Sequence, residues 1–148
     1  MTPSQELIEH IKLAESFRAK PYMDQGSLAI GYGHHGSEVC LGLVWTEAQA
    51  DKVLDADLVV FGNQVAKLVK VPLTQGQFDA LVDFVYNLGA GRLQSSTLLR
   101  MLNKKEYAAA GQQFLRWNYV DGKPNDNLLV RRKWELEMWE KQGIGNRE

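Results

Sequence analysis

The sequence predicts an α+β fold in which a small β-containing N-terminal lobe and a helical C-terminal lobe are joined by a long helix. Three observations predict it. Apolar residues recur at helical spacing before residue 15 and again after residue 74. Between residues 28 and 33, large and small side chains alternate with the period of a strand. The 148 residues, 45% of them hydrophobic and 24% charged, suit a single globular domain.

The first helix is predicted from Thr2, a typical N-cap residue, with Pro3 at the first helical position and Gln5 at the third. Its apolar residues then follow at spacings of three and four: Leu7, Ile8, Ile11 and Ala14. Pro21 cannot continue a helix, so this helix is expected to end before it.

A β-hairpin is predicted between Tyr22 and His34, around the turn signal of residues 24–27. A third short strand is expected near residues 39–44. In the second strand the small residues Ala29, Gly31 and Gly33 share one face. A face without bulk would let a polymer chain lie close to the backbone, although glycines also serve close packing inside a protein.

A long helix is predicted from Glu47 to about Lys70, loosened near Gly62 and ended by Pro72. Thr46 and Gln49 form a capping box at its start. We expect one domain, 1–148, with a β-containing lobe at about 15–56 and a helical lobe at about 71–148 plus the N-terminal helix. Two lobes joined by a helix leave a cleft, which is a common ligand site.

The remainder of the chain is predicted to be helical. Thr74 and Gln77 form a second capping box, which opens a helix that ends at a Gly89 C-cap. Ser96 caps a short helix through Leu102. Two further helices are predicted, one over 106–117 and one that begins at about residue 126.

Composition excludes several classes of function. A formal net charge of −1 and a pI near 6.3 do not support nucleic-acid binding. The single cysteine excludes an intramolecular disulfide. The N-terminus has no apolar run long enough for a signal peptide or a membrane span, so we expect neither secretion by a signal peptide nor membrane insertion.

Two acidic residues are the candidates for catalysis. Glu15 continues the apolar helical face, where partial burial would raise its pKa and let it donate a proton. Asp24 lies in a polar turn, where it would stay ionised. Two carboxyl groups with separated pKa values are typical of glycoside hydrolysis. For Glu15 the alternatives are an acid paired with an internal Arg or one turned to the surface at a frayed helix end. For Asp24 the alternative is an Asx turn.

Other polar residues carry weaker signals. His34 is expected to make a structural hydrogen bond or ion pair, and its neighbourhood shows no metal-ligand spacing, so no metal is predicted. Asn87 is either a residue of the helix end or a contact to a sugar amide. Arg131 belongs to a basic run that is usually a solvated helix face, although an Arg there could pair with Glu15 or with a polymer.

Several stretches in this order resemble the phage-type lysozymes, the endolysins of glycoside hydrolase family 24. They are ESFRAKPYMD, AIGYGHH, VPLTQGQFDALVDFVYNLGAG, SSTLLRMLN, FLRWNYVDGK and LLVRRKWELE. The resemblance implies a lysozyme-like fold and cleavage of the β-1,4 bond between N-acetylmuramic acid and N-acetylglucosamine in peptidoglycan, without a cofactor. It implies Glu15 as the acid and Asp24 as the second carboxylate. The expected substrate contacts are Ala29, Gly31, Tyr32 and Asn87.

The chain departs from this family at two positions beside the acids. Ser16 stands where the family usually has Gly, and Ala29 stands where it usually has Thr. The turn is also one residue shorter. Ala29 lacks the hydroxyl that helps the Asp position the attacking water. Either Asp24 with Ser27 or another group holds the water, or hydrolysis is impaired.

Three activities are compatible with these residues. The first is hydrolysis by a muramidase. The second is a lytic transglycosylase, which would need only Glu15. The third is a catalytically impaired variant that binds the wall. The resemblance also implies a monomer made in the host cytoplasm and released to the wall through a holin-type membrane lesion.

Overall fold

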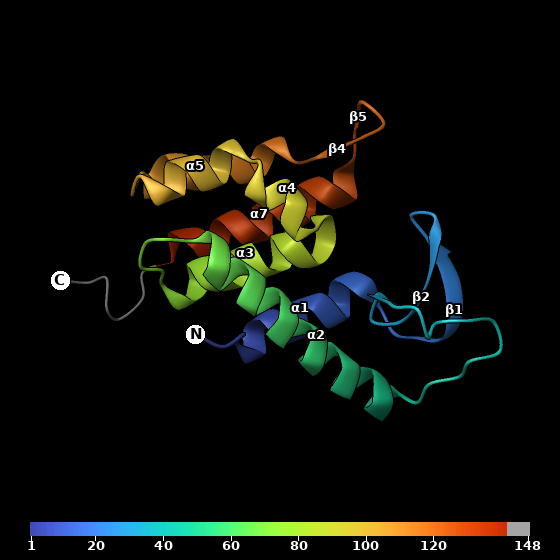
Figure 1. Cartoon of the computed structure of the whole chain (residues 1–148). Coiled ribbons are helices and arrows are strands. Elements are labelled where there is room, and N and C mark those ends of the chain that lie inside the picture. Colours follow the sequence, from blue (N-terminus) through green and yellow to red (C-terminus); the bar gives the residue numbers. More distant parts are fainter. Residues whose placement is uncertain (142–148) are drawn as a thin grey trace. The chain divides into compact units, whose positions relative to one another are not determined.

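The computed structural model describes residues 1–141, which form two compact units (Figure 1). One unit comprises Gln5–Val60, and the other comprises Met1–Ser4 with the chain from Phe61 onward. Most elements are helices, and they are accompanied by a three-stranded and a two-stranded sheet. The predicted α+β class is confirmed, whereas the predicted lobe boundaries and the cleft stay predictions.

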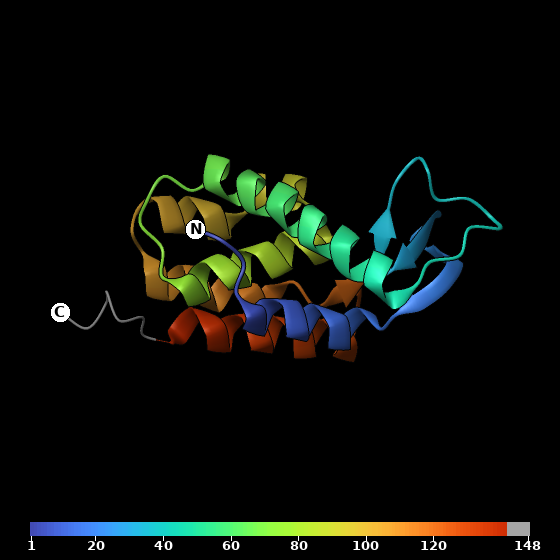
Figure 2. The same cartoon turned by 90° about the horizontal axis from the view of Figure 1, so that it is seen from below.

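The unit of residues 5–60 combines helices with the three-stranded sheet. Its elements are α1 (Gln5–Glu15), β1 (Arg18–Asp24), β2 (Ser27–Gly31), β3 (His34–His35) and the larger part of α2 (Glu47–Leu68). The strands are antiparallel in the order β1-β2-β3. Figure 2 shows them together with the long connection that leads from β3 to α2. The buried apolar side chains include Leu7, Ile11, Ile30, Leu54 and Leu58.

Helix α1 begins at Gln5, so the prediction that Thr2 caps it and Pro3 opens it is wrong. The four residues before it are held by contacts to α3 (Gln75–Leu88) instead. The Ser4 hydroxyl and N–H both donate to the Asp79 carboxylate, and the Thr2 carbonyl accepts from the side chain of Gln75. Because these partners are about 75 residues away in the sequence, no local pattern indicates them.

The predicted hairpin is confirmed, and its turn is short. Asp24 pairs with Ser27 across Gln25 and Gly26, which both have positive φ, 50° and 86°. Such a two-residue turn matches the right-handed twist of the strands. The third strand is His34–His35, which pairs with β2. The prediction of a strand near residues 39–44 is therefore wrong.

Strand β2 is covered on both faces. Ala29 and Ile30 are fully buried, and Gly31 and Tyr32 are buried as well. A Cβ added to Gly31 would lie 3.1 Å from the Trp45 ring. The prediction of an open face without bulk is therefore wrong, because the small residues make room for close packing inside the protein.

Helix α2 runs without interruption through Gly62, so the predicted loosening is wrong. A Cβ added there would meet the Phe78 ring at 3.2 Å, which shows that glycine lets the helix approach that ring. The predicted capping box at its start is confirmed. The Thr46 hydroxyl accepts from the N–H of Gln49, and the Gln49 side chain accepts from the N–H of Thr46.

The second unit is built around α3, which buries nine consecutive residues, Gln77–Val85, and packs against α7 (Asp126–Glu140). Between them lie α4 (Ala90–Gln94), α5 (Thr97–Asn103), α6 (Tyr107–Gln113), the 3-10 helix η1 (Phe114–Arg116), β4 (Tyr119–Val120) and β5 (Lys123–Pro124). The caps predicted at Thr74 and Ser96 are confirmed. The hairpin β4–β5 was not predicted, and the predicted helix 106–117 divides into α6 and η1.

Across residues 1–141, none of the helices combines the length and the apolar character that a membrane crossing requires.

Candidate active site

Glu15 is the last residue of α1 and is half-buried. It follows the buried Ile11 by four residues, which continues the face that α1 turns to the core. A Cβ added to Gly33 would lie 2.7 Å from Glu15 Oε1, so the carboxylate rests against the backbone of the turn after β2. A residue with a side chain at position 33 would displace the carboxylate.

Ser16, the residue after Glu15, lies at the C-terminal end of α1. The N–H of Ser16 donates to the Lys12 carbonyl at 3.0 Å, and Ser16 has φ of +62°. This is the left-handed helix terminus that glycine usually occupies. Ser16 therefore adopts a conformation that favours glycine, at a cost of about 1 kcal/mol.

Asp24 is the last residue of β1, and its side chain is 35% exposed. Its Oδ2 lies 3.0 Å from Nε2 of His35, on β3. The other ring nitrogen, Nδ1, lies 2.8 Å from the Ser27 hydroxyl. His35 is thus a site residue that the sequence analysis missed. Its signal was weak, because a histidine eleven residues from an acid has no recognisable spacing.

Tyr22 connects the two acids electrostatically, and it was also missed. Burial raises the pKa of Tyr22, and the negative charges of Glu15 and Asp24 raise that pKa further. The Arg18 guanidinium, 4.6 Å from the ring centre, opposes the increase. Tyr22 therefore lies within electrostatic range of both carboxylates. The two-residue spacing from Tyr22 to Asp24, which puts both on one face of β1, was the available signal.

His34 has a structural role, as predicted. Its Nδ1 lies 2.7 Å from Asp57 Oδ2, and its Nε2 lies 2.6 Å from Glu38 Oε1. Burial opposes the charged ring, but the hydrogen bonds to these two acids prevail and raise the pKa of His34. The ring thereby ties β3 to α2. Among residues 1–141, no cluster of three or more His, Cys, Asp or Glu side chains could hold a metal ion.

Asn87, near the end of α3, is oriented by a buried ion pair of the helical unit. Its Oδ1 accepts from Arg132 Nη2 at 2.8 Å. The same guanidinium bonds Glu135, and neither side chain of this pair is exposed. Burial first, and then the charge of Asp83, raise the pKa of Glu135. The Asn87 amide is therefore held with its oxygen turned toward Arg132.

Arg131 is buried, so the interpretation as a solvated helix face is wrong. Its Nη2 lies 2.9 Å from Asp83 Oδ1, and its Nε lies about equally close to both Asp83 oxygens. Such a fork between guanidinium and carboxylate is strongly directional. The alternative that one Arg of this run pairs with Glu15 or with a polymer stays a prediction.

The residues expected to contact substrate differ in their surroundings. Ala29 and Gly31 are buried in the sheet. Tyr32 is only 6% exposed, and its ring packs on Phe17 at a centroid distance of 5.8 Å. None of these three belongs to an open surface. Asn87 is half-buried. In the unit of residues 5–60, the two candidate acids are thus Glu15, at the end of a helix, and Asp24, whose carboxylate is hydrogen-bonded to the His35 imidazole.

The sequence model of the phage lysozyme family matches residues 12–135. The endolysin of Salmonella phage P22 is 39% identical over 137 residues, which cover 89% of this chain and 93% of that protein. The endolysin of Bacillus phage B103 is 45% identical over 142 residues, which cover 94% of this chain. The chain spans about half of the length of that relative, 54%.

A solved structure, the muramidase domain of SpmX from Asticaccaulis excentricus, has a similar fold. Its TM-score with this chain is 0.87 at 32% sequence identity. The match covers 95% of this chain and 99% of that domain.

Proposed function

This chain belongs to the phage lysozyme family, and on that premise we propose that it is a muramidase. It hydrolyses the β-1,4 bond between N-acetylmuramic acid and N-acetylglucosamine in bacterial peptidoglycan. The observation that carries the proposal is the placement of two acids in one unit, Glu15 at the end of α1 and Asp24 at the end of β1. The names of the relatives, endolysin and muramidase domain, support the same activity.

The two acids divide the reaction between them. Glu15 donates its proton to the glycosidic oxygen as the bond from that oxygen to C1 of the muramic acid breaks. Asp24 accepts a proton from a water molecule whose oxygen forms the new bond to C1. The product then has the inverted configuration at C1. Gly33 has no side chain, which leaves to the Glu15 carboxyl the space that a Cβ would take.

Asn87 is the proposed sugar contact outside this unit. Arg132 occupies the oxygen of its amide, so the NH₂ group is the end of the amide available to a ligand. An NH₂ donor suits the carbonyl oxygen of an N-acetyl group. The proposal includes no cofactor.

The proposal extends to how the protein reaches its substrate. We place it as a monomer in the host cytoplasm, from which a holin-type membrane lesion releases it to the wall. Cells that express the chain alone should keep their turbidity until the membrane is permeabilised. Lysis without permeabilisation would contradict this route.

The test is product analysis with purified peptidoglycan. Mass spectrometry should find new reducing ends that carry one added water. Fragments with 1,6-anhydro ends would identify a lytic transglycosylase instead. Binding to peptidoglycan without any loss of turbidity would identify a wall-binding protein.

A matched pair of variants tests the acid. Glu15→Gln should lower the rate by about 10³-fold, because an amide has no proton of suitable acidity to donate. Glu9→Gln, at an exposed position of the same helix, should leave the rate unchanged. Equal rates in both variants would overturn the role of Glu15.

A further inference from the structure

We propose that His35 is a positioning residue that holds Asp24 and Ser27 so that their oxygens jointly bind the attacking water. This inference rests on the proposed hydrolytic function and adds the groups that orient its nucleophile. His35 does not itself contact the reacting atoms in this scheme. Ser27, two residues before Ala29, has the hydroxyl group that Ala29 lacks.

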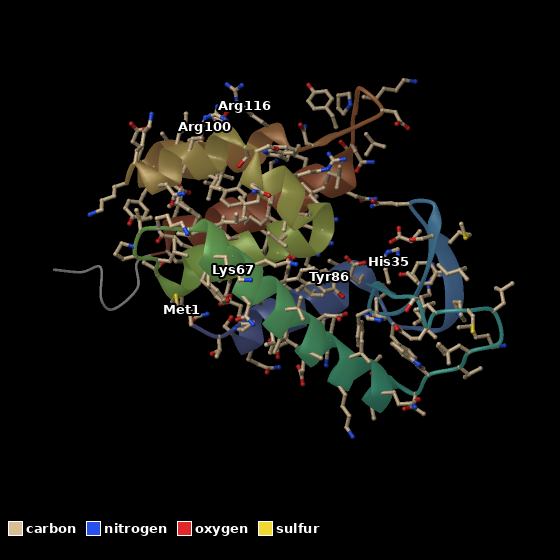
Figure 3. All side chains as sticks on the ribbon, in the orientation of Figure 1. Met1, His35, Lys67, Tyr86, Arg100 and Arg116 are labelled. Carbon is tan, nitrogen blue, oxygen red and sulfur yellow. The ribbon has the colours of Figure 1, made fainter. Side chains whose placement is uncertain are left out.

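The register of the sheet brings the three side chains together. Asp24 and Ser27 are Cα partners across the two-residue turn between β1 and β2. His35 is paired with Ala29 on the neighbouring strand, β3. The side chain of His35, labelled in Figure 3, bridges the other two. Its Nε2 lies 3.0 Å from Asp24 Oδ2, and its Nδ1 lies 2.8 Å from Ser27 Oγ.

The chemistry of the partners indicates the direction of each hydrogen bond. An ionised carboxylate only accepts, so Nε2 of His35 carries the proton and donates to Asp24. In the neutral ring Nδ1 is then an acceptor, and the Ser27 hydroxyl donates to it. The chain of bonds runs from Ser27 through His35 to Asp24. We infer this tautomer from the network.

The directions leave two acceptors for one water molecule. Asp24 Oδ1 takes part in neither bond, and Ser27 Oγ keeps its lone pairs because its proton is committed to the ring. A water that donates one hydrogen to each of these oxygens keeps a lone pair on its own oxygen for C1. Asp24 then takes the proton that the water loses.

A purely structural role for His35 makes a different prediction. The side chains of His35 and Asp24 are 41% and 35% exposed, and a polar contact this exposed contributes little to stability. If the cluster only fastened the turn, its loss would change the melting temperature slightly and leave kcat unchanged. If it orients the water, its loss lowers kcat and leaves KM nearly constant.

The experiment measures kcat and KM for release of reducing ends from peptidoglycan by the full chain. His35→Ala should lower kcat by about 10²-fold with little change in KM, because a misplaced nucleophile costs about that much. Ser27→Ala should lower kcat in the same way. His35→Gln should recover a large part of the loss, since its amide carries one donor and one acceptor. Ser37→Ala, at an exposed serine of the next connection, should match the unmodified chain.

The outcomes separate this inference from the proposed function. If the unmodified chain is active, Glu15→Gln is inactive and His35→Ala keeps full kcat, the positioning role is overturned and the muramidase stands. If the unmodified chain releases no reducing ends, both proposals fail. Circular dichroism confirms that each variant folds. Should His35→Ala unfold, full kcat in Ser27→Ala would overturn the role.

Discussion

The two units of this protein use the same charged residue types in opposite ways. In the unit of residues 5–60, Glu15 and Asp24 lie at the ends of elements and are partly open to solvent. In the helical unit, Asp83 and Glu135 lie in the middle of helices, with no exposed surface, and an arginine pairs with each.

The difference in burial separates carboxylates that stabilise the fold from carboxylates that could exchange protons with a substrate. A carboxylate that is buried and paired cannot exchange protons with a substrate, and removal of its partner leaves an uncompensated charge. A carboxylate at the end of a helix or strand remains reachable. The helical unit therefore uses Asp83 and Glu135 for support, whereas Glu15 and Asp24 lie where the proposed reaction requires them.

The largest expected effect comes from the buried pair. Arg132→Met leaves Glu135 without its cation and should lower the free energy of unfolding by about 3–5 kcal/mol. The double variant Arg132→Met/Glu135→Leu should recover much of that loss, because it removes both charges. Urea unfolding measures both. If Arg132→Met were as stable as the unmodified chain, the buried acids of the helical unit would not need their arginine partners for stability.

Gly33→Ala tests the support of Glu15 in the other unit. Gly33 has φ of +81°, and the added Cβ would lie 2.7 Å from Glu15 Oε1. We expect a loss of stability of about 1–2 kcal/mol from the backbone conformation and a loss of activity of about 10²-fold from the displaced carboxyl. Gly42→Ala is the control, since Gly42 also has positive φ but no atom near its added Cβ. It should lose stability and keep its rate per folded molecule.

The pH dependence of stability tests His34. Folding raises the pKa of His34 above its ordinary 6.5, so the folded protein binds this proton more tightly than the unfolded chain. The resulting stabilisation is fully present below pH 6.5 and is lost as the pH rises through the higher folded-state pKa. The difference in Tm between the unmodified chain and His34→Gln should therefore shrink from about pH 5.5 to about pH 8.5. A difference independent of pH would contradict the ion pairs of His34.

The smallest effect is expected at the end of α1. Ser16→Gly relieves the left-handed conformation at φ of +62° and should raise the free energy of unfolding by about 0.5–1 kcal/mol. Thermal unfolding measures the gain. Lys105→Gly, at the same backbone conformation in the helical unit, is the matched comparison. Similar gains in both would show that this strain is a property of the backbone and not of the site.

Local hydrogen bonding was predicted correctly from the sequence. The capping boxes at Thr46 and Thr74 and the cap at Ser96 each join residues three apart, so the sequence contains both partners within one turn. The hairpin turn at residues 25–26 is local in the same sense. The catalytic roles of Glu15 and Asp24 stay predictions.

The predictions that were wrong share one cause, because each depends on a contact between residues far apart in the sequence. Asp79 and Gln75 bind the residues before α1. Trp45 packs against Gly31, and Asp83 pairs with the buried Arg131. Each partner lies at least fourteen residues away, beyond any periodicity along the chain. The prediction of an open face on β2 failed because alternation reports which residues share a face, not whether that face is covered.

The sequence by itself determined the helices with local caps and the hairpin with its two-residue turn, because each depends on residues close together in the chain. Only the tertiary structure decided what surrounds Glu15 and Asp24. The pairing of β3 with β2 puts His35 within hydrogen-bonding distance of Asp24, and the turn after β2 places Gly33 against Glu15. Strand pairing across a sheet selects such neighbours by register, and register depends on the packing of the whole unit.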